Sequence, residues 1–145
     1  MRLTQHTDYS LRVLMYLALN PTKLVTIQEV SEKHQISRNH LMKVVQRLSH
    51  GEFITSVRGQ GGGMRLQRYA GDIALGDVVQ FMEPDFSVVE CFREENQCVI
   101  TPACRLKGLL SEALEQFLAQ LNRYSLEDLV QGKRRDDMLT LFQLD

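Results

Sequence analysis

The sequence predicts a mainly α-helical chain with one small β-hairpin wing, ordered as a winged helix-turn-helix followed by a long C-terminal helix. Two observations predict this class. Three segments with apolar residues spaced three and four apart come first, and only Gln35 and Ile36 separate the second from the third. A β-branched run, a glycine-rich tip and a resumed alternation of apolar and polar residues follow, which is the pattern of a hairpin.

The first helix is predicted over residues 7–20. Thr7 is its expected N-cap, Asp8 lies in the first turn, where the helix dipole favours an anion, and Pro21 ends it. Its apolar positions share the helical spacing and are Leu11, Leu14, Met15, Ala18 and Leu19.

The second and third helices form the predicted helix-turn-helix. The second begins after Thr26, which is expected to form a capping box with Glu29. Ser37 is expected to cap the third helix, residues 38–50, and Gly51 to stop it at the C′ position. Its buried face is expected to consist of Leu41, Val44, Val45 and Leu48.

The remaining elements follow the three helices. The hairpin is predicted from residues 53–57 and 64–66, and a fourth helix from residues 76–83. Residues 84–103 show no clean period, and the long helix is expected to run from Pro102 to about residue 123. A last helical turn should begin at Ser125. The predicted division is a DNA-binding domain, a cysteine-bearing loop and a dimerisation helix with its tail, at residues 1–83, 84–104 and 105–145.

Charge is divided unevenly along the chain. Residues 1–70 carry ten Lys and Arg residues against four acidic ones, a net charge of +6, whereas residues 71–145 have a net charge of −7. This division predicts that the first part binds a polyanion, although a chance fluctuation between two solvated surfaces is the alternative. The longest apolar run, residues 13–19, is too short to cross a bilayer, and no signal peptide is apparent. We therefore expect a cytoplasmic protein without membrane attachment.

Polar and cationic residues of the third helix and the wing are the candidate DNA contacts. Arg and Lys reach guanine acceptors, Asn reads adenine, and hydroxyl groups bind phosphate, whereas an Arg on a thin wing can enter the minor groove. An ordinary solvated helix face is the alternative. The glycine-rich tip lacks a Walker lysine and does not open a helix, which disfavours a nucleotide site. The candidates are Thr26, Ser37, Arg38, Asn39, His40, Lys43, Arg47, Arg58, Gly59 and Gln60.

Three cysteines within fourteen residues are the candidate metal ligands, namely Cys91, Cys98 and Cys104. An odd number cannot close a set of disulfides within one chain, and the spacing lacks the C-x-x-C pair of structural zinc sites. Thiolates suit zinc, copper(I) or an iron–sulfur cluster, and three of them leave one coordination position for a displaceable ligand. Three reduced cysteines without any ligand role remain the alternative.

The long C-terminal helix predicts a homodimer. Its apolar stripe is wider than one small winged domain can cover, and two copies packed together would place two third helices on a two-fold DNA site. The alternative is a helix folded back on its own domain. The stripe consists of Leu106, Leu109, Leu110, Ala113, Leu114, Phe117, Leu118 and Leu121.

Several short motifs carry a family resemblance over nearly the whole chain. They are Leu3-Thr4, Thr7-Asp8-Tyr9, Leu11-Arg12, Ile36 to Leu41, Val57-Arg58-Gly59, Gly61-Gly62-Gly63, Ile73, Gly76 to Val79, and Cys98 to Leu106. With these motifs the chain resembles the iron–sulfur winged-helix transcriptional repressors. The segment from Cys98 to Leu106 is similar to that of the nitric-oxide-sensing members more than to that of the regulators of cluster assembly.

The resemblance implies a site for an iron–sulfur cluster, 4Fe–4S with 2Fe–2S left open. Its thiolate ligands would be Cys91, Cys98 and Cys104. Asp8 from the partner subunit would complete the site, as an aspartate near the N-terminus does in the nitric-oxide-sensing members. Cluster-assembly regulators have a histidine shortly after the third cysteine, where this chain has Lys107 and no histidine beyond His50.

The function that the resemblance implies is that of a repressor and not an enzyme. As a homodimer it would bind double-stranded operator DNA and release it when nitric oxide nitrosylates the cluster. An iron- or redox-sensing member of the same family, and a cluster-free thiol or zinc regulator, are the alternatives. An iron–sulfur enzyme would need acid–base partners beyond Glu94 and Glu95, and a protein-interaction module would not need the cationic first half.

Overall fold

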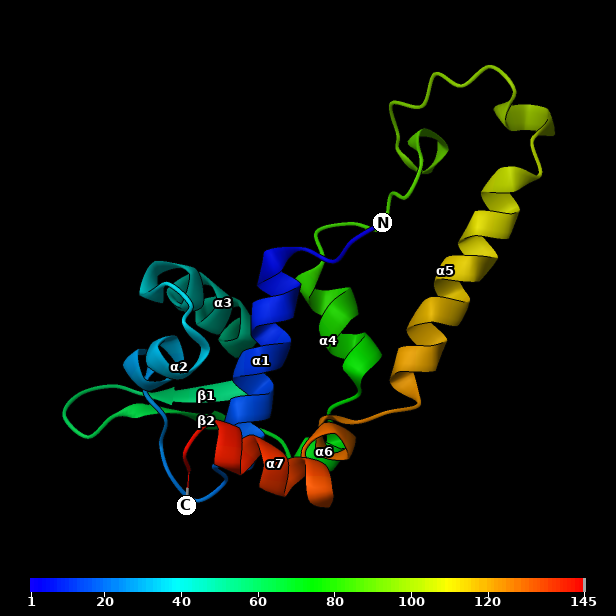
Figure 1. Ribbon diagram of the computed structural model, residues 1–145. Helices are drawn as coiled ribbons and strands as arrows, with labels where there is room; N and C mark the ends of the chain where they lie inside the picture. Colours follow the sequence, from blue (N-terminus) through cyan, green and yellow to red (C-terminus); the bar gives the residue numbers. More distant parts are fainter. Residues whose placement is uncertain (145) are drawn as a thin grey trace.

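The computed structural model describes residues 1–144 as a helical body from which one long helix projects (Figure 1). Helix α1 (Gln5–Leu19) is central and packs against α2 (Ile27–His34), α3 (Arg38–His50) and α4 (Leu75–Met82). The two-stranded wing lies beside the lower end of α1 in this view. The mainly α-helical winged helix-turn-helix predicted from the sequence is therefore confirmed.

Helix α1 begins one turn earlier than predicted. Its N-cap is Thr4 and not Thr7, because the Thr4 Oγ1 atom accepts a hydrogen bond from the Thr7 backbone N–H at 3.3 Å. Thr7 is fully buried inside the first turn, and its hydroxyl group donates to the Glu83 carboxylate. The sequence pattern missed this start because the partner that holds Thr4 and Thr7 lies at the end of α4.

The caps of α2 and α3 agree with the prediction in part. Thr26 caps α2, but the Glu29 side chain does not return to it as a capping box would require. The Glu29 carboxylate instead accepts hydrogen bonds from Tyr16 and Lys23. Ser37 caps α3, and the four residues predicted to be buried on α3 are buried.

Gly51 ends α3 for a different reason from the one predicted. Its φ of −80° is open to any residue, and the positive φ falls on Glu52, at 58°. A Cβ atom at Gly51 would lie 2.7 Å from the Phe81 ring and 2.8 Å from the Phe53 ring. Gly51 is therefore required by the packing of α4 against α3, and not by a left-handed turn.

The wing consists of β1 (Ile54–Val57) and β2 (Gly63–Leu66), which pair antiparallel. Val25 and Met64 exchange two backbone hydrogen bonds, of 2.9 and 2.8 Å, so the segment before α2 is attached to the wing as a third, one-residue partner. These bonds fix the orientation of the wing relative to the helix-turn-helix.

Residues 84–105 form an irregular loop, as predicted, with only short 3₁₀ turns at Glu90–Phe92 and Thr101–Ala103. The long helix α5 (Leu106–Asn122) begins after this loop. Pro102 was expected in the first turn of that helix but lies in the second 3₁₀ turn, which Cys104 terminates in an extended conformation. The C-terminal end of α5 packs against α4, and the N-terminal end of α5 adjoins the loop (Figure 1).

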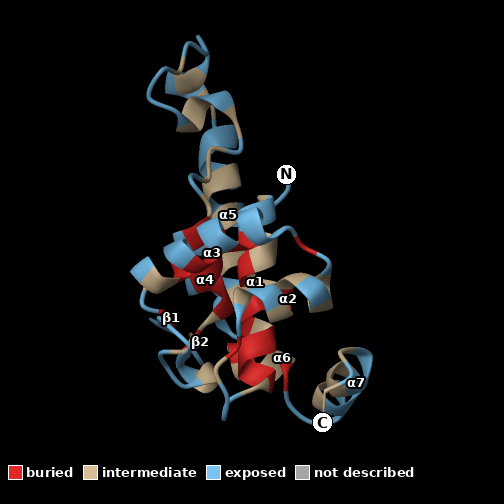
Figure 2. Cartoon of the chain, turned by 90° about the vertical axis from the view of Figure 1, so that its left-hand side faces the viewer, coloured by how far each residue is buried: buried red, intermediate tan, exposed pale blue. Residues whose placement is uncertain are grey.

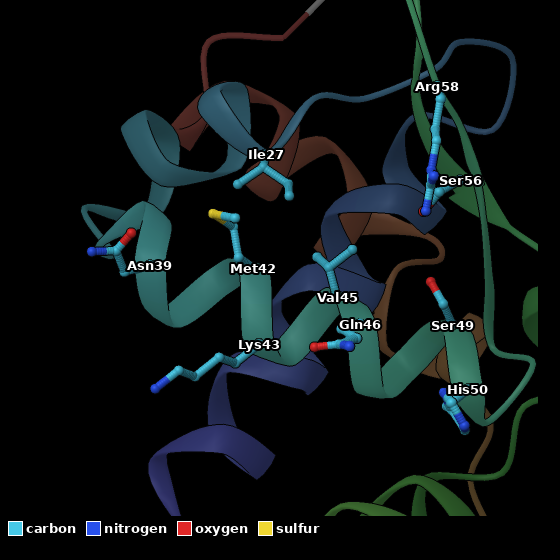
Figure 3. A pocket seen from close by; sticks show the side chains of 10 residues that line it. All are labelled: Ile27, Asn39, Met42, Lys43, Val45, Gln46, Ser49, His50, Ser56 and Arg58. Atoms are coloured by element: carbon cyan, nitrogen blue, oxygen red, sulfur yellow. The ribbon is translucent and has the colours of Figure 1, made fainter.

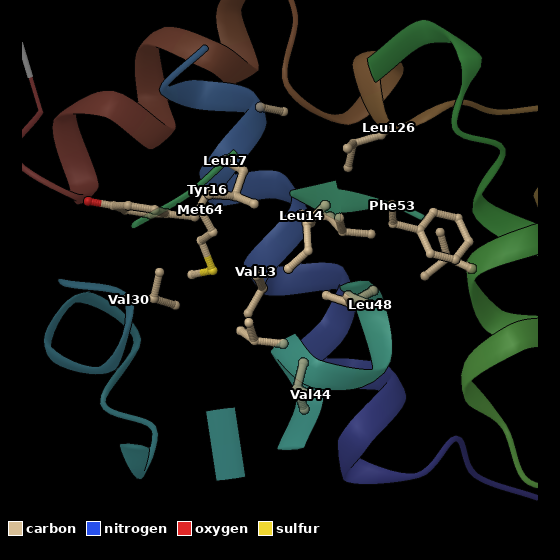
Figure 4. Close-up of a cluster of buried hydrophobic side chains, with 14 of the residues drawn as sticks. Val13, Leu14, Tyr16, Leu17, Val30, Val44, Leu48, Phe53, Met64 and Leu126 are labelled. Carbon is tan, nitrogen blue, oxygen red and sulfur yellow. The ribbon is translucent and has the colours of Figure 1, made fainter. Parts of the chain in front are cut away.

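The C-terminal segment returns to the body. The α6 helix (Leu126–Leu129) begins with a capping box between Ser125 and Asp128, and its Leu126 is fully buried. The α7 helix (Lys133–Leu141) follows. Figure 4 shows Leu126 in the cluster of buried side chains, on the side of Leu14 and Leu17 of α1, and Figure 2 shows that buried residues gather in the body while α5 has none.

An aromatic cluster holds the end of this segment. The Phe142 ring meets Tyr16 and His34 edge-on, with ring centroids 5.2 and 4.9 Å apart. The Lys33 ammonium group donates to the Phe142 carbonyl oxygen, and the Arg135 guanidinium group donates to the Leu19 carbonyl oxygen at 3.3 Å. Among residues 1–144, no helix is long and apolar enough to cross a membrane.

Candidate DNA-binding surface and cysteine loop

The outer face of α3 is exposed and cationic. Its predicted contact residues Arg38, Asn39, His40, Lys43 and Arg47 are all exposed, opposite the buried stripe. Figure 3 shows Asn39, Lys43, Gln46 and His50 along this helix, with Ser56 and Arg58 on the wing. These residues line an open groove of about 1060 Å³ between α3 and the wing. The structure therefore brings Asn39 and Lys43 of the predicted helix residues and Arg58 of the predicted wing residues to one groove.

Three cations of this surface are uncommitted. Arg38, Lys43 and Arg58 form no side-chain hydrogen bond or ion pair with other described residues. Because holding a long charged side chain in a fixed pair costs conformational entropy, such free cations are suited to an external anion. A row of free cations beside a groove is the arrangement that phosphate contacts require.

The wing tip is exposed at Arg58, Gly59 and Gln60. The chain reverses tightly here, with a positive φ of 95° at Gly59 and 75° at Gly61. At Gly62 a Cβ atom would lie 2.2 Å from the Val57 carbonyl oxygen, so only glycine fits. The result is a thin tip that carries one arginine.

The hydroxyl groups of Thr26 and Ser37 mark the N-termini of α2 and α3. Each accepts a capping hydrogen bond, from Glu29 N–H at 3.1 Å and from His40 N–H at 3.5 Å. A capping hydroxyl oxygen accepts through a lone pair, and its own proton stays available for donation to a phosphate oxygen. Both residues are exposed.

Arg47 differs from the other candidates because it is engaged within the chain. Its guanidinium group donates to the Phe81 carbonyl oxygen at 2.9 Å and lies 5.7 Å from the centre of the Phe81 ring. The residue remains exposed, but its position is set by the last turn of α4. Sequence reasoning could not find this link, since its partner lies 34 residues away.

The three cysteines are unpaired thiols on the loop between α4 and α5. Cys98 is exposed, whereas Cys91 and Cys104 are half-buried. Side-chain hydrogen bonds shape the middle of the loop, from Asn96 to Thr101 at 2.9 Å and from Thr101 to the Cys98 carbonyl oxygen at 2.8 Å. Among residues 1–144, no three His, Cys, Asp or Glu side chains lie close enough together to hold a metal ion.

The fourth predicted ligand, Asp8, lies on α1 and not on the loop. Its carboxylate is half-exposed and pairs with Arg12 at 2.8 Å on the next turn of the same helix. The structure of one chain thus does not join Asp8 to the three thiols. The donor chemistry still fits a soft-metal group, because three free thiols share one loop that has no disulfide.

The exposed side of α5 is apolar. No residue of α5 is buried, and Leu106 and Leu109 are 55% and 49% exposed although both are leucines. The helix is held to the body where Leu118 and Asn122 approach Gly76 on α4, leaving no space for a side chain at that glycine. An apolar helix that stands away from its own body is typical of a surface that a second chain covers.

These features define a winged helix-turn-helix transcriptional regulator, with the candidate DNA-binding surface on the body and the thiols on a separate loop. The chain belongs to the Rrf2 family, whose model is described as an iron-dependent transcriptional regulator and matches residues 3–132. It is a regulator of this family and not an enzyme.

Two relatives are similar over almost their full length. The HTH-type transcriptional regulator NsrR of Bacillus subtilis (strain 168) is 47% identical over 146 residues, 99% of each chain. The regulator of the same name from Shouchella clausii (strain KSM-K16) is 46% identical over 145 residues, 99% of this chain and 96% of the relative. The resemblance stated from the sequence motifs is confirmed by these matches.

Solved structures share the fold. T. potens IscR superposes with a TM-score of 0.70 at 22% identity, covering 89% of this chain and 85% of that one. At this identity the likeness establishes the fold alone. It confirms the fold class predicted from the order of helices and hairpin.

Proposed function

We propose that this chain is a nitric-oxide-responsive, iron–sulfur-dependent repressor that binds a two-fold operator as a homodimer in the cytoplasm. One observation carries the proposal: three free thiols share a loop, while the cationic face of α3 is exposed and its Arg38 and Lys43 have no side-chain partner among the described residues. A sensor needs both a reactive site and an effector surface, and here they lie on separate parts of one chain. The similarity to regulators named NsrR supports the nitric oxide signal.

The DNA-binding role falls to α3 and the wing. The N-terminal part of a recognition helix faces base edges, which would assign base contacts to Arg38, Asn39, His40 and Lys43. Thr26 and Ser37 would bind phosphate through their hydroxyl groups. On the wing, Arg58 would enter the minor groove, with Gly59 and Gln60 approaching the backbone closely. Arg47 would contact phosphate with the guanidinium N–H groups that Phe81 does not use.

The metal-binding role falls to the loop. Cys91, Cys98 and Cys104 would hold a cluster through thiolate, 4Fe–4S in preference to 2Fe–2S, and Asp8 of the partner subunit would supply a carboxylate oxygen. When bound, such a cluster supplies iron that reacts with nitric oxide. Asp8 would then alternate between the loop and its ion pair with Arg12, which this structure shows. Because the three thiols are spread along the loop, a bound cluster would hold the two ends of the loop at a fixed distance. A change in the cluster would then alter the spacing of α4 and α5, which the loop connects.

Dimerisation would cover α5. Leu106 and Leu109 lie near the start of that helix, next to the end of the cysteine loop. Packing two copies of α5 would bury this apolar stripe and bring each loop near the partner, where Asp8 would be supplied. The same two-fold axis would set two copies of α3 against successive major grooves.

The test is an anaerobic absorption spectrum followed by a nitric oxide titration with DNA binding measured in parallel. We expect an iron–sulfur band at about 400 nm that bleaches as the operator is released. The Cys98→Ser variant should lack both the band and the response. Ala119→Glu, a change on an exposed site of α5 away from the loop, should keep both and serves as the control.

The contrary outcomes separate the alternatives. A colourless protein that binds operator DNA after anaerobic reconstitution would indicate a thiol or zinc regulator. A coloured protein whose DNA affinity follows iron supply or redox state, and ignores nitric oxide, would indicate the iron- or redox-sensing alternative. Either result would overturn the proposal.

A further inference from the structure

The last turn of α4 is held from two sides, immediately before the cysteine loop begins. On one side Glu83 reaches the N-terminus of α1. A single carboxylate oxygen, Oε1, accepts hydrogen bonds from the Thr4 backbone N–H at 2.8 Å, from the Thr4 hydroxyl group at 3.1 Å and from the Thr7 hydroxyl group. Thr7 is fully buried, and Thr4 and Glu83 are half-buried, so this contact is partly shielded from water.

On the other side the same turn is fixed to α3. The Phe81 carbonyl oxygen accepts from the Arg47 guanidinium group at 2.9 Å, and the Phe81 ring lies 5.6 Å from the Phe53 ring. Gly51 leaves no free space against Phe81, because a Cβ there would meet the ring at 2.7 Å. The end of α4 therefore cannot shift without disturbing the C-terminal half of α3.

Glu83 is the last residue before the loop. Pro84 follows it directly and prevents α4 from continuing, and Cys91 lies on the first 3₁₀ turn of the loop. Any displacement of the loop's start acts first on Glu83. A carboxylate with three donors resists such displacement more strongly than a neutral contact, since hydrogen bonds to a charged group are about twice as strong.

We propose that Glu83 is a positioning residue that couples the cysteine loop to the DNA-binding helices, through its bonds to Thr4 and Thr7. This inference rests on the proposed sensing function and names the link on which that function depends. Asp8 lies one residue beyond Thr7 on the same first turn of α1, so Glu83 also sets where Asp8 is presented. Because α1 packs against α3, a change in the loop reaches α3 both through α1 and through the end of α4.

The experiment compares Glu83→Ala, Glu83→Gln and the control Asp85→Asn. Asp85 is an exposed carboxylate two residues further on, and it accepts a hydrogen bond from the Ser87 N–H at 2.7 Å within the loop. For each protein, operator affinity is measured with the site loaded and after nitric oxide, at matched iron content. The ratio of the two dissociation constants reports coupling, which a loss of overall stability does not change.

We expect this ratio to fall by about tenfold in Glu83→Ala relative to the parent chain. Glu83→Gln retains the length and one acceptor oxygen, so its ratio should lie between those of the parent and Glu83→Ala. Asp85→Asn should match the parent. Amide hydrogen exchange of the iron-free proteins gives a second readout: residues 5–8 and 47–53 should both exchange faster in Glu83→Ala than in Asp85→Asn.

The outcomes distinguish this inference from the proposed function. A parent chain that ignores nitric oxide would refute the proposed function, and hydrogen exchange would then decide alone whether Glu83 links the two segments. A parent chain that responds, with an unchanged ratio in Glu83→Ala, would overturn the coupling role. Faster exchange confined to residues 5–8 would reduce Glu83 to a cap of α1 and would also overturn it.

Discussion

His34 is a titratable side chain in an apolar position. Its ring packs against the Tyr16 and Phe142 rings, and its Nε2 atom is buried with no hydrogen-bond partner among the described residues. Burial lowers the pKa of His34 below its ordinary value of 6.5, with the nearby Arg12 charge acting in the same direction and Asp8 against it. The protonated form is thus disfavoured where the C-terminal segment meets α2.

The sign of the resulting pH dependence is fixed. The unfolded chain binds a proton at His34 more readily than the folded one, so stability is lost as pH falls through 6.5 toward the lower folded value. We expect the parent chain to be less stable at about pH 5.5 than at about pH 7.5, and His34→Leu to lose part of this difference. Urea denaturation at the two pH values checks it. An identical difference in both proteins would contradict the role of His34.

Arg58 is the side chain on which the wing's contribution to DNA binding depends. Arg58→Ala should weaken operator binding by about 1–3 kcal/mol and lower the salt dependence, because a free cation on a thin tip is lost. Binding isotherms at several salt concentrations measure both quantities. Arg123→Ala removes an exposed cation from the end of α5 and should leave both unchanged. An unchanged affinity and salt slope in Arg58→Ala would remove Arg58 from the surface.

At the level of single residues, prediction from the sequence succeeded where the cause is local. The caps Thr26 and Ser37 and the exposed face of α3 follow from residues within one or two turns. The engagement of Arg47 with Phe81, and of Thr7 with Glu83, joins residues that are 34 and 76 positions apart. No periodicity or capping signal encodes such pairs.

The helix α5 shows how an element can be predicted while its surroundings are not. Its apolar stripe and its end near residue 123 follow from helical spacing, and the structure adds that Leu106 and Leu109, at the start of the stripe, are exposed and that no residue of the helix is buried. Its start was misplaced because a proline suits the first turn of a 3₁₀ helix as well as that of an α-helix. The start of α1 was misplaced because its cap depends on Glu83.

The exposed stripe leads to a prediction about assembly. Leu109→Glu places a carboxylate in the surface that two copies of α5 would bury. Because the dimer has two-fold symmetry, each subunit contributes one such carboxylate to the interface. We expect the dissociation constant of the dimer to rise at least about tenfold. Sedimentation velocity over a concentration series measures this. Ala119→Glu adds the same charge at an exposed position of α5 outside the apolar stripe and is the control. Equal behaviour of the two variants would place the dimer interface elsewhere.

Over the whole molecule, the body is assembled from both ends of the chain. The wing and the first four helices occupy residues 5–82, but Leu126 and Val130 complete their core, and Phe142 closes the side next to α2. The sequence predicted the order of the elements and the opposed charges of the two parts. It predicted no element beyond the last turn at Ser125, because residues 131–137 carry no apolar side chain that could mark a helical stripe and the apolar residues begin only at Met138.

The tail's contribution to stability can be measured at one side chain. Phe142→Ala removes a ring that packs against Tyr16 and His34, and should lower the free energy of unfolding by about 2 kcal/mol, less than for a fully buried phenylalanine. Its neighbour Leu141 is 80% exposed, so Leu141→Ala should have little effect. Chemical denaturation of the two variants compares them. Equal stabilities would show that the tail does not support the body.

The return of α6 to the core has a consequence for synthesis on the ribosome. A nascent chain that has emerged as far as the cysteine loop already contains α1 to α4 and the wing, yet Leu126 has not arrived to cover the core. The backbone bonds that Leu75 and Leu126 make to Tyr124 and Ile73 are also absent at that stage. The winged helix-turn-helix body is therefore completed only after the loop and α5 have been synthesised. A nascent chain that ends earlier does not expose a fully folded DNA-binding domain.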